Sequence, residues 1–209
     1  MSAEIRLTGE GVSKVFDRRT VFSEVSFSVA FGETLLITGR NGSGKSTLVK
    51  IISSVLTPTR GSVTLTWPAS RSSRDRISQI GLVAPYLQMF EEFSALENLS
   101  IAAGIRGAPY SAREAGELLE RLSIDPRRDD PLRTYSSGMK QRVKYAFALL
   151  HHPLALILDE PMANLDLDGV AIVRALMAEQ QAKGILVVAT NDLTDIDRYD
   201  RRVELNGSR

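Results

Sequence analysis

Residues 39–47 have the composition and spacing of a loop that binds phosphate. They read Gly-Arg-Asn-Gly-Ser-Gly-Lys-Ser-Thr, which fits the pattern G-x-x-x-x-G-K-[ST]. In such a loop the glycines let successive backbone N–H groups turn toward phosphate oxygens, and the helix that follows adds partial positive charge. The pattern predicts that Lys45 reaches the β and γ phosphates and that Ser46 ligates Mg²⁺. The candidate phosphate-binding residues are Gly39, Arg40, Asn41, Gly42, Ser43, Gly44, Lys45, Ser46 and Thr47.

A glycine-rich turn that binds nothing is the alternative interpretation of residues 39–47. The flanking sequence argues against it. An apolar run, Leu35-Leu36-Ile37, precedes the loop, and a plausible helix over residues 48–52 follows it. This strand–loop–helix order is the context that the pattern requires.

Two carboxylates follow a second apolar run, residues 154–158. Asp159 and Glu160 come directly after it. Because sites in parallel sheets lie at the carboxyl ends of the strands, we expect Asp159 to hold Mg²⁺, directly or through water. Glu160 can accept a proton from an attacking water. An ordinary strand end followed by two solvated acidic residues would show the same sequence pattern. The presence of the loop at 39–47 in the same chain favours a hydrolytic site.

The elements that must position these residues fall into two kinds. Short apolar runs bounded by turn or polar residues predict buried parallel strands, at residues 35–37, 81–83, 154–158 and 185–189. Alternating patterns over residues 25–31 and 62–66 predict half-solvated antiparallel strands. Helical patterns lie between these runs, one of them from about Asp168 to Lys183 with Gly184 as its stop. The fold class is therefore α/β, with a mixed-β opening third.

Two further segments carry a resemblance to a known family. Residues 135–142, Tyr-Ser-Ser-Gly-Met-Lys-Gln-Arg, resemble the signature of ABC-type ATPases, usually written LSGGQ, and residues 160–166 resemble the end of the family's Walker B strand and its D-loop. The resemblance extends from Ile5 to Leu205. It implies a P-loop NTPase core with a mostly parallel sheet, an antiparallel β subdomain on the N-terminal side and an inserted α-helical subdomain.

The signature segment adds a second anion site to the chain. We expect Ser136 and Ser137 to cap a helix from about Gly138 to Leu150, although an ordinary N-cap would explain the two serines alone. In ABC ATPases the Walker loop of one subunit faces the signature of the other. The resemblance therefore implies a head-to-tail dimer with two ATP molecules between the subunits. It adds as candidate ATP-binding residues Phe16, against the adenine, and Ser136, Ser137 and Gly138.

The chain departs from the family pattern at two positions. The slot of the glutamine that senses Mg²⁺ and the membrane partner holds Pro85, and Gln88 is the candidate replacement. The slot of the switch histidine holds Asn191, which can donate a hydrogen bond but cannot become cationic. The candidate catalytic residues are thus Glu160, Lys45 and Asn191, and the candidate metal ligands are Ser46, Asp159 and Gln88.

Composition limits the classes of function. The chain has 209 residues, no cysteine and a formal net charge of +1. Cysteine chemistry and disulfides are excluded, and the charge gives no indication of a nucleic-acid partner. No apolar run approaches the roughly 18 residues that span a bilayer, and the N-terminus lacks a signal-peptide stretch. Any membrane role must come through a partner.

The resemblance implies one ABC ATP-binding domain over residues 1–209, with a helical subdomain at approximately 86–150. Such a stand-alone subunit pairs as a homodimer or an ATPase heterodimer and works with an integral membrane permease, at the cytoplasmic face of the cell membrane. Residues 86–93 suit a groove that receives a permease helix, or a loop that covers the core. The signature form and residues 84–87 look closest to haem-exporter ATPases of cytochrome c maturation, and exporters of lipids or polysaccharides share much of them.

Two other functions remain as alternatives to a transport ATPase. A soluble ABC protein of translation or DNA repair usually has two cassettes or a long coiled-coil insertion, and this chain has neither. A regulatory module with low turnover would be consistent with Pro85 and Asn191. Glu160 argues against the regulatory module, because a protein that no longer hydrolyses ATP has no need of a proton acceptor.

Overall fold

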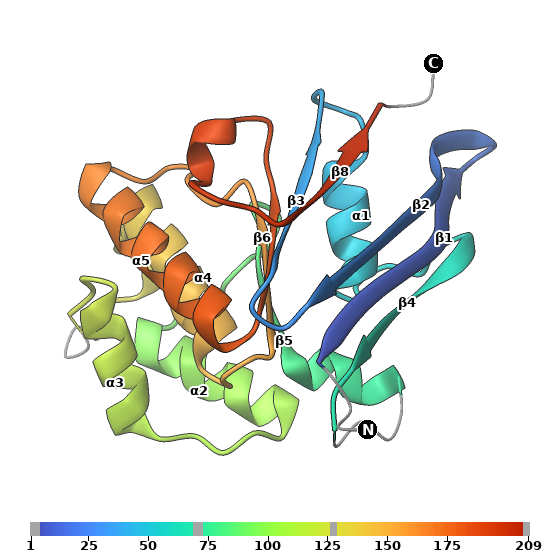
Figure 1. Cartoon of the computed structure of the whole chain (residues 1–209). Coiled ribbons are helices and arrows are strands. Elements are labelled where there is room, and N and C mark those ends of the chain that lie inside the picture. Colours follow the sequence, from blue (N-terminus) through green and yellow to red (C-terminus); the bar gives the residue numbers. More distant parts are fainter. Residues whose placement is uncertain (1–4, 69–72, 126–128, 207–209) are drawn as a thin grey trace.

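The computed structural model describes residues 5–68, 73–125 and 129–206, which form two sheets flanked by helices (Figure 1). The first sheet is antiparallel, with strand order β2-β1-β4. Its strands are β1 (Arg6–Phe16), β2 (Arg19–Ala30) and β4 (Arg60–Thr66). The side chains that this sheet buries include Phe27, Val29, Val63 and Leu65. The alternating patterns predicted at residues 25–31 and 62–66 are thereby confirmed, except that Phe31 lies beyond the end of β2.

The second sheet has five parallel strands in the order β5-β6-β7-β3-β8. The strands are β3 (Thr34–Gly39), β5 (Ile80–Val83), β6 (Ala155–Asp159), β7 (Ile185–Ala189) and β8 (Arg201–Leu205). The four apolar runs form the four neighbouring strands β5, β6, β7 and β3, as predicted. The edge strand β8 was not foreseen, because its sequence is largely polar and only Leu205 is buried.

Five α-helices lie between the strands of the described chain. They are α1 (Lys45–Ile52), α2 (Ala95–Arg106), α3 (Ala112–Arg121), α4 (Ser137–Leu149) and α5 (Leu167–Lys183). Three short 3₁₀ turns complete the elements: η1 (Ser73–Gln79), η2 (Leu132–Thr134) and η3 (Leu193–Asp195). Helix α5 ends at Lys183 as predicted, although Gly184 is extended, with a φ of −173°, rather than left-handed.

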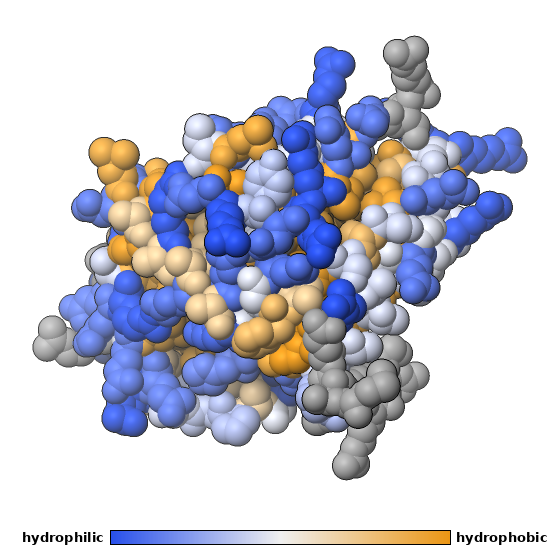
Figure 2. Space-filling view, in the orientation of Figure 1, coloured by the Kyte–Doolittle hydropathy of each residue, from blue (hydrophilic) through white to orange (hydrophobic). Residues whose placement is uncertain are grey.

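Two cores lie on opposite faces of the parallel sheet, because side chains alternate along each strand. Leu36 faces a core that α2, α3, α4 and α5 help to form, whereas Leu35 and Ile37 face a core that α1 and the antiparallel sheet share. Figure 1 shows this division, with α4 and α5 on one side of the sheet and α1 on the other. Figure 2 shows the same view from outside, where hydrophilic side chains cover most of the face.

Candidate functional site

The phosphate loop, residues 39–47, joins the buried strand β3 to α1. Gly39, Gly42 and Gly44 all have positive φ, of 147°, 79° and 104°. At Gly39 a Cβ atom would lie 2.4 Å from the Leu205 carbonyl oxygen, and at Gly44 it would lie 2.6 Å from Val21 Cγ1. Both positions therefore need glycine on steric and conformational grounds. The shape of the loop therefore depends on these two glycines.

Lys45 is the first residue of α1 and is only 7% exposed. Its Nζ donates a hydrogen bond of 2.8 Å to the carbonyl oxygen of Gly39, at the start of the same loop. A buried ammonium is stable only when it has such a partner. The contact keeps the charge inside the curve of the loop, where phosphate oxygens would bind.

Asp159 ends β6 and is 1% exposed. Within the described residues, neither carboxyl oxygen has a hydrogen-bond partner. Burial raises the pKa of this carboxyl, while the nearby Ser46 hydroxyl and the charges of Lys45 and Lys50 oppose the shift. A buried carboxylate with free oxygens beside a serine hydroxyl fits a hard divalent cation such as Mg²⁺.

The protein supplies only part of such a coordination shell. Among residues 5–68, 73–125 and 129–206, no three His, Asp or Glu side chains are grouped so that they could hold a metal ion. Mg²⁺ ordinarily keeps several waters and binds one or two protein groups together with substrate phosphates. Ser46 and Asp159 are in keeping with that mode of binding.

Glu160 follows Asp159 with a positive φ of 50°. Its backbone N–H donates to the carbonyl of Ala189 over 2.8 Å, and the Thr190 hydroxyl lies 3.4 Å from its Oε2. Burial is the main cause of a raised pKa at Glu160; the charge of Lys45 opposes it, and those of Asp159 and Asp195 add to it. A raised pKa makes this carboxylate a better proton acceptor. Sequence reasoning missed Thr190, which is fully buried and borders the slot of Asn191.

Helix α4 begins at the signature segment. The Ser136 hydroxyl accepts a hydrogen bond of 3.2 Å from the Met139 N–H and is the N-cap. Ser137 is already the first helical residue, so the expectation that both serines cap the helix is wrong. Of the two serines, only Ser136 has the extended backbone that a cap requires. The helix ends at Leu149, one residue earlier than expected.

The signature helix is tied to the loop after Glu160. A Cβ atom at Gly138 would lie 3.0 Å from the carbonyl oxygen of Asn164. The buried Tyr145 hydroxyl donates a hydrogen bond of 2.8 Å to the carbonyl of Pro161. Tyr145 was missed at the sequence level, because a tyrosine within a helical pattern carries no signal for a contact with a distant loop.

The family model described as "ABC transporter" matches residues 22–163, more than half of the chain. The chain belongs to this family. It is therefore an ATP-binding protein and an ABC-type ATPase, which confirms the resemblance read from the signature and Walker segments.

Individual relatives agree with this assignment. The chain is 36% identical over 208 residues to the lipoprotein-releasing system ATP-binding protein LolD of Shewanella denitrificans, covering 93% of this chain and 89% of that protein. It superimposes on a solved ATP-binding subunit of an ABC transporter with a TM-score of 0.84 at 29% identity, covering 96% and 85% of the two chains. A dimeric bacterial ABC transporter cassette gives a TM-score of 0.82 at 25% identity, with 96% and 94% covered. The predicted fold class is confirmed.

The two departures of this ABC ATPase from the family pattern have different surroundings. Asn191 lies beside the phosphate loop, where its side-chain amide donates to Asn41 Oδ1 over 3.3 Å. Pro85 is exposed. The exposed Gln88 helps to line a cavity of about 400 Å³ beside α4, whose walls include Ser137, Lys140 and Gln141. The role of Gln88 as a metal ligand stays a prediction.

Phe16 lies at the end of β1 with 45% of its surface exposed. The Lys14 ammonium lies 4.7 Å from the centroid of its ring. An exposed ring of this kind is free to stack on a base. The contact with adenine itself stays a prediction.

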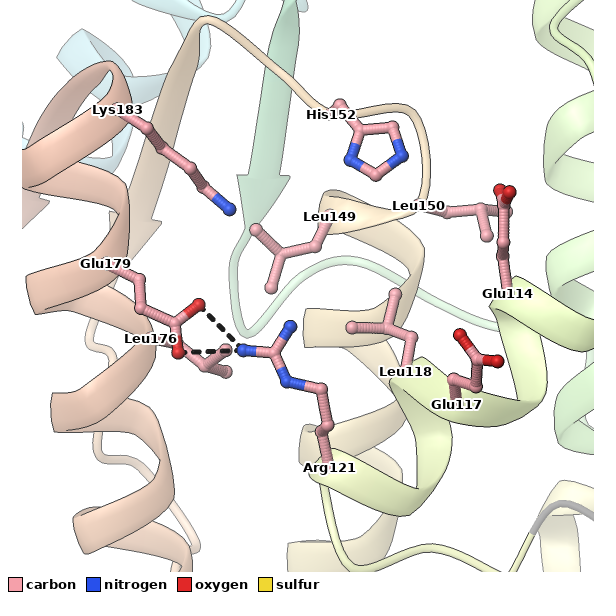
Figure 3. A pocket seen from close by; sticks show the side chains of 10 residues that line it. All are labelled: Glu114, Glu117, Leu118, Arg121, Leu149, Leu150, His152, Leu176, Glu179 and Lys183. Carbon is pink, nitrogen blue, oxygen red and sulfur yellow. Dashed lines mark hydrogen bonds and ion pairs between the residues drawn. The ribbon is translucent and has the colours of Figure 1, made fainter.

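A second cavity, of about 200 Å³, lies between α3, α5 and the end of α4 (Figure 3). Arg121 extends from α3 to the Glu179 carboxylate on α5, with contacts of 2.7 and 2.8 Å. None of the described residues that line it belongs to the phosphate loop or to β6. This cavity is therefore separate from the candidate phosphate site.

The described part of the ABC ATPase contains no helix that is both long and apolar enough to cross a membrane.

Proposed function

We propose that this ABC ATPase binds ATP with Mg²⁺ and hydrolyses it to drive a transporter. The observation that carries the proposal is a pair of buried charged residues, one in the phosphate loop and one at the end of β6. Lys45 is held inside the loop by the Gly39 carbonyl, and Asp159 has two buried oxygens without partners among the described residues. The positive charge of Lys45 complements a phosphate chain, and the negative charge of Asp159 complements the cation bound to it.

Each residue of the site then has one task. Lys45 and the N–H groups of the phosphate loop bind the phosphates, and Ser46 and Asp159 ligate Mg²⁺. The cation neutralises charge that develops on the phosphate oxygens. Glu160 accepts the proton of the attacking water. Asn191 donates a neutral hydrogen bond near the γ-phosphate, and Phe16 stacks on the adenine.

We further propose that hydrolysis takes place between two cassettes arranged head to tail. Each chain has two helix N-termini suited to phosphate, at Lys45 and at Ser137. A single ATP cannot use both within one chain if the family arrangement holds, because the two belong to different composite sites. The dimeric state of one similar solved cassette supports this arrangement. The second chain is either a copy of this one or a related ATPase.

The proposed partner is an integral membrane permease, which places this subunit at the cytoplasmic face of the membrane. Phe90 and Phe93 are 52% and 42% exposed, and their rings meet edge to face at 6.2 Å. Exposed aromatic residues on a loop are suited to a partner helix. We propose that residues 86–93 receive that helix, and that the whole chain of 1–209 is one domain whose helical subdomain covers approximately 86–150.

The proposed cargo is lipophilic. The relative named above acts in lipoprotein release by its name, which favours a lipid-modified cargo. Haem export and cytochrome c maturation stay predictions that rest on the form of the signature and of residues 84–87 alone. Identification of the permease that purifies with this subunit would distinguish a lipid-modified cargo from haem.

A low-turnover regulatory protein is the second candidate, favoured by Pro85 and Asn191. Steady-state phosphate release from the purified protein with ATP and Mg²⁺ separates the candidates. We expect turnover in the parent and its loss in Lys45→Ala, with Lys183→Ala, an exposed lysine at the end of α5, as the matched control. Equal turnover in Lys45→Ala and the parent would contradict the site. ATP binding without turnover would favour regulation.

A further inference from the structure

Tyr86 lies at the same edge of the sheet as Asp159. Strands β5 and β6 are parallel neighbours, and Val83 pairs with Leu158. The chain therefore leaves β5 beside the point where Asp159 ends β6. From α1, the Lys50 ammonium lies 4.2 Å from the centroid of the Tyr86 ring. A cation–π contact of this length stabilises the ring in this position.

The hydroxyl of Tyr86 is buried without a hydrogen-bond partner in the described chain. Buried polar groups are nearly always hydrogen-bonded, so an orphaned phenol needs an explanation. Burial raises the pKa of Tyr86, and the charge of Asp159 raises it further, which is consistent with the closeness of the two groups. Both Asp159 oxygens are orphaned as well. Two buried polar groups near one another, neither with a hydrogen-bond partner in the described chain, are suited to a bridging water.

We propose that Tyr86 is a positioning residue of the cation site: its hydroxyl donates a hydrogen bond to a water that lies against Asp159 outside the first shell of Mg²⁺, and Lys50 holds its ring in place. This inference rests on the proposed function. A phenol is protonated at neutral pH and can donate, whereas the Asp159 carboxylate only accepts. The water would thus accept a hydrogen bond from Tyr86 and donate one to Asp159, so that both buried groups have a partner.

Tyr86→Phe tests the hydroxyl, because it keeps the ring under Lys50. Mn²⁺ binding to the ADP-loaded protein, followed by electron paramagnetic resonance, replaces activity as the readout. Loss of an outer-shell partner typically weakens metal affinity by about 10–100-fold. We expect about tenfold weaker Mn²⁺ binding, with unchanged ADP affinity in EDTA and an unchanged melting temperature. Tyr110→Phe is the matched control, since Tyr110 donates to the Leu96 carbonyl away from this site.

The outcomes separate this inference from the proposed function. If ADP promotes Mn²⁺ binding in the parent and Tyr86→Phe binds Mn²⁺ equally well, Tyr86 has no part in the cation site. If ADP does not promote Mn²⁺ binding in the parent, the proposed cation site and this inference both fail. Equal weakening of ADP affinity in EDTA would assign Tyr86 a purely structural role and would also overturn the proposal.

Discussion

The side-chain amide of Asn191 donates a hydrogen bond of 3.3 Å to Oδ1 of Asn41, which lies in the phosphate loop. The two residues are 150 positions apart in the sequence. The segment that follows β7 is thus linked to the phosphate loop. This contact holds the Asn191 side chain beside the phosphate loop.

Asn191→Ala should slow turnover and leave ATP affinity nearly intact. The loss of one neutral hydrogen bond, worth about 1 kcal/mol, corresponds to about fivefold in rate. Asn191→His should hydrolyse ATP at a similar or faster rate, because a charged donor is stronger than a neutral one. Steady-state ATPase assays of both variants beside the parent measure the effect. Parent-like turnover in Asn191→Ala would exclude Asn191 as the replacement for the switch histidine.

Glu160→Gln should trap an ATP-bound dimer. Glutamine keeps the size of the side chain but cannot accept the proton of the attacking water, so the γ-phosphate remains and bridges the two chains. Light scattering after gel filtration in ATP and Mg²⁺ gives the mass. The double variant with Lys45→Ala serves as control and should stay monomeric. A monomer of Glu160→Gln at saturating ATP would count against the sandwich arrangement.

Asp195→Asn should move the acid limb of the ATPase pH profile to lower pH. The charge of Asp195 helps to raise the pKa of Glu160, so its removal lets Glu160 lose its proton at lower pH. Asparagine keeps an oxygen to accept the Thr190 hydroxyl, which lies 2.6 Å from Asp195 Oδ2. The ratio of kcat at pH 6 to that at pH 8 should rise. Asp197→Asn, an exposed neighbour paired with Arg174, should leave the ratio unchanged.

His151→Gln should make stability less dependent on pH. Burial, then the charge of Arg106, lowers the pKa of His151 from 6.5 to about 4. The folded protein therefore binds fewer protons than the unfolded chain, and the parent loses stability as the pH falls from about 6.5 toward 4. With allowance for solvent screening, we expect the parent to lose about 1 kcal/mol more than His151→Gln between pH 7.5 and 5.

Urea denaturation at the two pH values measures this difference. Arg106 Nη1 lies 2.9 Å from His151 Nδ1 and 2.6 Å from Nε2, and glutamine retains an acceptor for it. The adjacent His152 is exposed, so His152→Gln should behave like the parent. An identical pH dependence in His151→Gln and the parent would show that His151 does not set the acid sensitivity.

The sequence alone determined the local parts of this protein. The phosphate loop, the four apolar strands and the carboxylates at the end of β6 could all be predicted, because each rests on neighbouring residues with a fixed spacing. A strand that is buried on both faces must be apolar throughout, and a loop that wraps phosphate must contain glycine at set positions. The family followed from the resemblance of residues 135–142 and 160–166 to the ABC signature and D-loop, together with the order of these segments and the phosphate loop along the chain.

The tertiary structure decided which distant residues meet. The sheet order β5-β6-β7-β3-β8 differs from the chain order, and it brings Asn191 to Asn41 and Tyr86 toward Asp159. The polar edge strand β8 also depends on pairing with β3, since its own sequence has little apolar patterning. Whether a polar atom is satisfied depends on every neighbour that packs around it. The orphaned oxygens of Asp159 and Tyr86 are therefore properties of the packed structure, which no local sequence pattern can encode.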